Sequence, residues 1–86
     1  MDKYRLQIRR SAKRDLQRLP RSFFARINPR ILALCDDPRP PGVRKLKGEQ
    51  DGWRIRVGDY RVLYQIDDTN RMITIVRVRH RRDVYN

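Results

Sequence analysis

Arginines alternate with other residues in two stretches of the C-terminal half, and the first stretch has the pattern of a β-hairpin. Residues 53–64 contain Arg54, Arg56 and Arg61 on either side of the dipeptide Gly58-Asp59. A two-residue loop at that dipeptide predicts that Arg56 and Arg61 lie directly opposite each other on neighbouring strands. Opposed like charges reduce the stability of a sheet. We therefore interpret these arginines as ligands for an anion, phosphate above all, that binds between the guanidinium groups.

The second stretch, residues 77–85, combines further arginines with the only histidine of the chain. Histidine changes its charge near neutral pH, so His80 is a candidate for acid–base chemistry. The alternation of side chains along a strand places His80 on the face opposite to Arg79 and Arg81, which favours a hydrogen-bonded structural histidine instead. Tyr85 is an aromatic residue that can stack on a base, or that anchors the C-terminus to the sheet.

The composition indicates a polyanionic partner. The 86 residues include 22 lysines and arginines against 10 acidic residues, which gives a net charge of +12 and a pI near 11.2. A domain this basic binds nucleic acid or an acidic protein far more often than a neutral metabolite. The single cysteine and the lack of a Cys/His cluster predict no disulfide, no metal and no cofactor. The longest apolar run, 31–35, is too short to span a bilayer, so we expect a soluble cytoplasmic protein without membrane contact.

One strand and two helices are predicted for the N-terminal half. Residues 4–8 alternate apolar and polar side chains in the manner of a half-buried strand. Helices are predicted over residues 12–19 and from about 22 to 34, because apolar residues recur there on one helical face. Ser11 and Ser22 are the candidate N-caps.

Pro29 lies inside the second predicted helix. An internal proline removes one backbone hydrogen bond, and its ring clashes with the carbonyl four residues earlier. We therefore expect a kink at this point, or a helix that restarts near Asn28.

The hairpin and a third strand over about 72–78 complete a sheet. The order β-α-α-β-β-β describes a single α+β domain over residues 1–86, in which the N-terminal strand and the helical hairpin pack on one face of a mainly antiparallel sheet. The other face, with the arginines, remains open to a ligand. Pairing of Ile66 with Met72 would place Arg77 opposite Arg61 and extend the basic face onto the third strand.

These features together resemble the RelE toxins of prokaryotic toxin–antitoxin systems. The resemblance covers nearly the whole chain and is most specific in the block Trp-Arg-Ile-Arg-Val-Gly-Asp-Tyr-Arg-Val-Leu-Tyr at 53–64 and in His-Arg-Arg-Asp-Val-Tyr at 80–85. It implies a RelE-like microbial RNase fold and membership of the RelE/ParE superfamily. It also implies an mRNA interferase that cleaves messenger RNA in the ribosomal A site. The implied partners are the ribosome, mRNA and a co-expressed acidic antitoxin of the RelB type, with which the toxin forms a hetero-oligomer.

Site residues follow from the resemblance by position. The catalytic set is Arg54, Arg56, Arg61, Arg81 and Tyr85. Many relatives have lysine where this chain has the first two arginines, and arginine is a poor general base because it stays protonated. RNA supplies its own nucleophile, the 2′-hydroxyl, so cleavage without metal would leave a 2′,3′-cyclic phosphate and a 5′-hydroxyl. Further substrate-binding candidates are Lys45, Lys47, Arg77, Arg79 and His80.

Two other functions are consistent with the sequence. A ParE-like toxin would inhibit DNA gyrase and cut nothing, and it would have no chemical need for the catalytic set. A basic RNA-binding module without catalysis would leave RNA intact. Its binding would weaken with salt, and each arginine would contribute similarly to the affinity.

Overall fold

One strand, two helices and four further strands follow one another along the chain, and a short helix comes after the last strand. The computed structural model describes residues 3–48 and 52–84, without the side chains of Asp83 and Val84. The elements in chain order are β1 (Arg5–Ile8), α1 (Arg10–Gln17), α2 (Arg21–Ala33), β2 (Arg44–Lys45), β3 (Gly52–Val57), β4 (Tyr60–Asp67), β5 (Met72–His80) and α3 (Arg81–Val84). This order confirms the predicted α+β fold and adds two short elements that were not predicted, the strand β2 and the helix α3.

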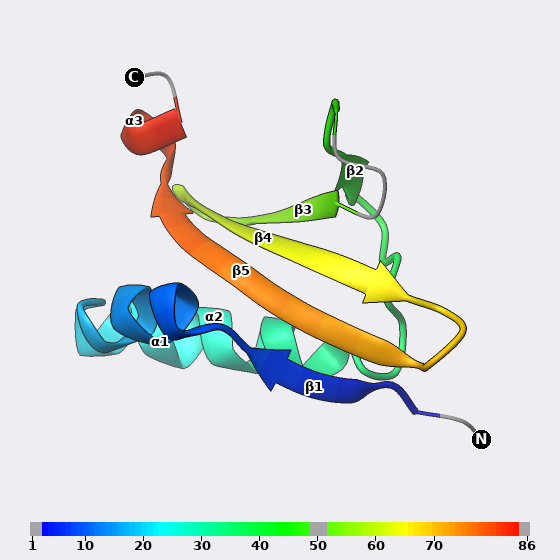
Figure 1. Ribbon diagram of the computed structural model, residues 1–86. Coiled ribbons are helices and arrows are strands. Elements are labelled where there is room, and N and C mark those ends of the chain that lie inside the picture. The colour runs from blue at the N-terminus through cyan, green and yellow to red at the C-terminus, as the bar shows by residue number, and fades with distance from the viewer. Residues whose placement is uncertain (1–2, 49–51, 85–86) are drawn as a thin grey trace.

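The strands form one sheet in the order β1-β5-β4-β3-β2, with β1 parallel to β5 and every other pair antiparallel. Figure 1 shows α1 and α2 against one face of this sheet, whereas α3 lies at the end of β5. None of the described helices covers the opposite face, and we call it the open face. None of the described helices is long and apolar enough to cross a membrane.

The core lies between the two long helices and the sheet. Tyr64 is its largest fully buried side chain, and its hydroxyl donates a hydrogen bond to the carbonyl of Pro38 at 2.7 Å. Burial raises the pKa of Tyr64, because the anionic form would lose its hydration. The buried apolar residues are Ala12, Ile27, Ile31, Leu34, Ile55, Val57, Val62, Tyr64, Ile66, Ile73, Ile75 and Val78.

Neither predicted serine cap exists. Helix α1 begins at Arg10, so Ser11 lies in its first turn and donates its hydroxyl to the carbonyl of Val76 at 2.9 Å, which ties the helix to β5. Helix α2 begins at Arg21, with Pro20 as its N-cap and Ser22 already helical. The N-cap Arg9 has extended backbone angles, and neither Arg9 nor Pro20 supplies a side-chain cap.

Helix α2 runs without interruption through Pro29, so the predicted restart near Asn28 is wrong. Ile27 and Ile31 flank the proline and are both buried in the core. Their burial holds the two halves of the helix against the sheet and outweighs the lost backbone hydrogen bond.

The β3–β4 hairpin has the predicted register. Arg56 lies opposite Arg61, and the loop is Gly58-Asp59. Gly58 has a positive φ of 61°, whereas the φ of Asp59 is not positive. This combination is typical of a type II′ turn. The glycine is needed there because a side chain disfavours this backbone conformation.

The predicted register of β4 and β5 is wrong. Asp67, not Ile66, lies opposite Met72, because the connection between the strands is one residue shorter than expected. An irregularity between Leu63 and Tyr64 adds a second one-residue shift. The neighbour of Arg61 on β5 is therefore Arg79 and not Arg77.

Candidate nucleic-acid interface

Three arginines form a row across three adjacent strands of the open face. Arg56 on β3 lies opposite Arg61 on β4, which in turn lies opposite Arg79 on β5. Neighbouring strands are about 4.8 Å apart, so the row places three positive charges within roughly 10 Å at the backbone level. Arg61 occupies the centre and is only 8% exposed, whereas Arg56 is exposed.

A cavity of about 260 Å³ lies at one end of this row. Its lining residues are Arg56, Gly58, Asp59, Arg61 and Arg81. We call it the arginine cavity. Because three of its side chains are guanidinium groups, which are fixed forks of N–H donors, the cavity is suited to an anion with several oxygens, such as phosphate.

Arg81 reaches the arginine cavity from the first position of α3. Its backbone N–H donates to the carbonyl of Asp59 at 2.6 Å, which anchors the end of β5 to the hairpin turn. Its guanidinium Nη1 lies 3.8 Å from Asp59 Oδ1, and both side chains are mostly exposed. An exposed ion pair of this kind contributes little, so Arg81 can exchange the carboxylate for a phosphate.

A second hollow, of about 320 Å³, continues the basic surface beyond Arg56. Arg30 on α2, Arg44 on β2 and Arg54 on β3 line it together with Arg56. Arg30 and Arg44 were not among the site residues predicted from the sequence. Arg44 could have been found from the charge run 44–47, whereas Arg30 comes to this surface only through the packing of α2.

Arg77 lies outside the arginine cavity and is engaged in the fold. Its Nε donates to Asp15 Oδ2 at 2.8 Å, and its Nη2 lies 3.3 Å from Asp15 Oδ1. Asp15 also accepts the backbone N–H of Val78 at 2.9 Å. This carboxylate therefore fastens α1 to β5, and the prediction that Arg77 continues the basic face beside Arg61 is wrong.

His80 lies on the helix face of the sheet, away from the arginine cavity. Its ring packs edge-on against Tyr60, with centroids 5.1 Å apart, and Tyr60 packs against Phe23 at the same separation. Its Nδ1 accepts the backbone N–H of Arg82 at 3.3 Å. The position agrees with the structural interpretation of this histidine.

The two predicted lysines flank the other end of β3. Lys45 Nζ lies 5.2 Å from the centroid of the Trp53 ring, and the guanidinium of Arg39 lies 4.9 Å from it. Lys47 is exposed in the loop that follows β2. Neither lysine lines the arginine cavity. Tyr85 lies outside the described residues.

The arginine cavity offers positive charge and few other functional groups. Asp59 is its only carboxylate, and no imidazole lines it among the described residues. Within residues 3–48 and 52–84, no group of three or more His, Cys, Asp and Glu residues could hold a metal ion. The chemistry available here is the orientation and charge neutralisation of a phosphate.

The fold and this site agree with a known class of toxins. The family model described as the ParE toxin of type II toxin–antitoxin systems matches residues 6–85. The chain therefore belongs to the RelE/ParE family of type II toxin–antitoxin toxins.

Individual relatives match over nearly the full length. Toxin RelG of Mycobacterium tuberculosis is 37% identical over 92 residues, which cover 95% of this chain and 95% of that protein. The toxin–antitoxin complex RelBE2 of the same organism contains a chain with a TM-score of 0.80 and 32% identity, covering 92% of this chain and 99% of that one. The archaeal RelE–RelB complex of Pyrococcus horikoshii gives a TM-score of 0.81 at 32% identity, covering 94% and 97%.

Proposed function

We propose that this toxin is a ribosome-dependent endoribonuclease that cleaves mRNA in the ribosomal A site without a metal ion. The observation that supports this most strongly is the convergence of Arg56, Arg61 and Arg81 on one small cavity of the open face. The first two come from opposed strands and the third from the residue after β5. Folding alone does not favour such a concentration of like charge.

In the proposed reaction the 2′-oxygen of one ribose attacks the adjacent phosphorus, and the bond from phosphorus to the 5′-oxygen breaks. Arg56 and Arg61 hold the non-bridging oxygens and neutralise the charge that accumulates in the transition state. The 2′-hydroxyl gives its proton to solvent water, and the departing 5′-oxygen, to which Arg81 donates a hydrogen bond, takes up a proton from solvent water. The products are a 2′,3′-cyclic phosphate and a 5′-hydroxyl.

The burial of Arg61 strengthens its proposed role. At 8% exposure the residue lies in surroundings poorer in water than those of Arg56, so a phosphate bound to it experiences less screening. A preorganised cation of this kind stabilises transition-state charge without reorganising at the moment of reaction.

The dependence on the ribosome follows from what the cavity lacks. The described residues that line it offer no imidazole and one carboxylate, Asp59, which already faces Arg81. Catalysis would then depend on correct alignment of the 2′-oxygen with the phosphorus, and a ribosome that holds the mRNA in a bent conformation can supply that alignment. Free RNA would be cleaved slowly.

Neighbouring groups would bind the flanking nucleotides. Arg54, with Arg30 and Arg44 in the adjoining hollow, is placed to bind the next phosphates along the strand. Stacking of Tyr85 on a base remains a prediction. The charge of +12 and the RelB-bound relatives support an acidic antitoxin as partner in the cytoplasm.

Inhibition of DNA gyrase is the second candidate, favoured by the description of the matching family model as a ParE toxin. A gyrase inhibitor that does not cut nucleic acid would gain nothing from three guanidinium groups in one cavity. The two functions separate in a supercoiling assay with purified gyrase.

The test is primer extension on an mRNA under translation by purified ribosomes, with a ribosome-free control. We expect cuts within codons that require ribosomes and the wild-type toxin. Arg61→Ala and Arg81→Ala should each lower the cleavage rate about 10²–10³-fold, the usual effect of removing one transition-state ligand. Arg14→Ala, an exposed change on α1, should leave it unchanged. Intact mRNA beside blocked supercoiling would assign the toxin to gyrase.

A further inference from the structure

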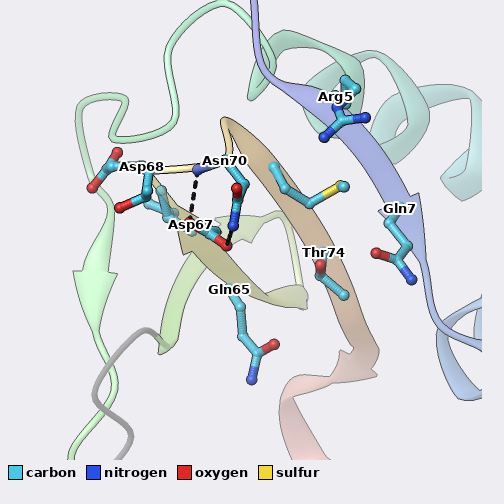
Figure 2. A pocket seen from close by; sticks show the side chains of 10 residues that line it. Arg5, Gln7, Gln65, Asp67, Asp68, Asn70 and Thr74 are labelled. Carbon is cyan, nitrogen blue, oxygen red and sulfur yellow. Dashed lines mark hydrogen bonds between the residues drawn. The ribbon is translucent and has the colours of Figure 1, made fainter.

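A further hollow lies on the open face, at the end away from the arginine cavity. Its volume is about 660 Å³, and Figure 2 shows the side chains that surround it. The lining residues are Arg5, Gln7, Gln65, Ile66, Asp67, Asp68, Thr69, Asn70, Met72 and Thr74. None of them belongs to the site described above.

A row of neutral hydrogen-bonding side chains crosses the floor of this hollow. Thr74 on β5 is the register partner of both Gln7 on β1 and Gln65 on β4, so the three lie side by side on adjacent strands. Figure 2 shows them projecting from three neighbouring strands. We call this set the Gln–Thr–Gln row. It supplies two amides and one hydroxyl, each of which can donate and accept hydrogen bonds.

The orientation of the Gln65 amide is fixed by a neighbour. Arg9 Nη2 lies 3.3 Å from Gln65 Oε1, and an arginine has donors only, so the amide atom that faces it must be the oxygen. The amide NH₂ of Gln65 is thereby left to donate elsewhere. It has no hydrogen-bond partner among the described residues, and Gln65 lines the hollow.

The carboxylates at the rim favour an uncharged ligand for this row over a second phosphate. Asp67 lies at one end, where its two carboxylate oxygens accept hydrogen bonds from the backbone N–H and the side-chain amide of Asn70 at 3.0 and 2.9 Å. These donors lower the pKa of Asp67, so it remains ionised. A phosphate would meet this negative charge, whereas the edge of a nucleobase would not.

The position of the row relative to the arginine cavity fits one continuous RNA strand. Gln65 and Arg61 are four residues apart on β4, and both lie on the open face. At about 3.4 Å per residue their separation along the strand is roughly 14 Å. A single-stranded RNA held at Arg61 can therefore place a neighbouring base over the Gln–Thr–Gln row.

We propose that the Gln–Thr–Gln row is a base-binding subsite that reads one nucleobase of the mRNA beside the cleaved bond. Gln65 donates its amide NH₂ to an acceptor on the base edge, while Thr74 and Gln7 complete the contacts. Met72 and Arg5, at the rim, offer an apolar and a planar surface to the ring. The inference rests on the proposed endonuclease activity and adds to it a source of sequence preference.

Gln65→Glu is the sharpest variant. The new carboxylate keeps and strengthens the contact with Arg9, because a charged acceptor binds an arginine more tightly, but it removes the NH₂ donor. Thr74→Val removes a hydroxyl with little change of shape. Gln17→Glu, exposed at the end of α1, changes the charge equally on the other side of the molecule and serves as the control.

The first experiment measures cleavage of an mRNA library with randomised codons in the ribosomal A site and at its flanks. We expect the wild-type toxin to prefer one base at a position near the cut, and Gln65→Glu to weaken that preference roughly tenfold, as for the loss of one base contact. Thr74→Val should weaken the same preference, and Gln17→Glu should not. An unchanged profile in Gln65→Glu and Thr74→Val would overturn the subsite, although cleavage itself would persist.

The second experiment does not depend on cleavage. An oligoribonucleotide with 2′-O-methyl groups cannot be cut, and its binding is followed through the side-chain NH₂ resonances of Gln7 and Gln65 in the free toxin. We expect these resonances to shift and the shifts to depend on the identity of one base. Shifts confined to the arginines, or shifts caused only by the antitoxin, would overturn the inference and would make the row a protein contact.

Discussion

The opposed arginines of the open face should reduce stability while they serve function, and Arg56→Gln separates the two effects. Arg56 is exposed and lies directly opposite Arg61, which is 8% exposed. A neutral glutamine retains most of the side-chain length and removes the repulsion. We expect the variant to be more stable than the wild-type toxin and much less active.

The expected gain in the free energy of unfolding follows from the distance between the two charges. Charges about 6 Å apart in water repel by roughly 0.7 kcal/mol, and like charges at directly opposite strand positions cost about 0.2–1 kcal/mol. A gain of about 0.5 kcal/mol should raise the melting temperature of a domain of this size by about 2–4 °C. At an ionic strength of 1 M the Debye length is about 3 Å, so the gain should largely vanish.

The assay is thermal unfolding at low and high salt, with Arg5→Gln as the matched control. Arg5 is also an exposed strand arginine, but its partner on β5 is Met72. The control should change the melting temperature less than Arg56→Gln does. A lower melting temperature in Arg56→Gln, an equal rise in the control, or a rise that persists at 1 M salt would refute the reasoning.

Three further predictions concern the fold that positions the site. Asp15→Ala should lower the free energy of unfolding by about 2–3 kcal/mol in urea denaturation, because it removes the acceptor of the Val78 N–H and the Asp15 carboxylate that binds Arg77. A loss below about 1 kcal/mol would contradict this prediction. Gly58→Ala should cost about 1–2 kcal/mol, because φ of 61° disfavours a side chain and the new Cβ would lie 3.3 Å from Arg26 Nη2; an unchanged melting temperature would show that the turn adapts. Hydrogen bonds from Arg39 and Tyr4 hold the pKa of Asp68 below its ordinary value, so the stability they contribute is complete above about pH 3.9 and is lost as the pH falls through the lower folded-state pKa. Asp68→Asn should therefore reduce the loss of stability in acid when the free energy of unfolding is measured against pH. An identical pH profile in the variant would argue against the contact.

Local patterns in the sequence were sufficient to predict the β3–β4 hairpin and the positions of its arginines. The dipeptide Gly58-Asp59 sets the loop, and a two-residue loop fixes the pairing of Arg56 with Arg61 without any knowledge of the rest of the chain. The order of the longer elements could also be predicted, because strand and helix periodicities differ clearly in residues 4–34, whereas the short β2 and α3 were not predicted.

Features that depend on tertiary contacts could not be predicted in the same way. The pairing of β4 with β5 depends on a shorter loop and on an irregularity at Leu63/Tyr64, and no residue pattern marks the second of these. This register moves Arg77 away from Arg61, and its contact with Asp15 could not be predicted because the two residues are distant in sequence and meet only when α1 packs beside β5. Arg30 joins the basic surface for the same reason, through the packing of α2.

The most direct test of the proposed chemistry replaces one 2′-hydroxyl of a ribosome-bound mRNA. A single 2′-deoxynucleotide is placed on the 5′ side of a mapped cut, and single-turnover cleavage at that bond is compared with cleavage of the all-ribose mRNA. Metal-free attack by the 2′-oxygen predicts that the cut disappears at the deoxy position, and that the all-ribose product ends in a 2′,3′-cyclic phosphate. Continued cleavage at the deoxy position would contradict the account of the arginine cavity.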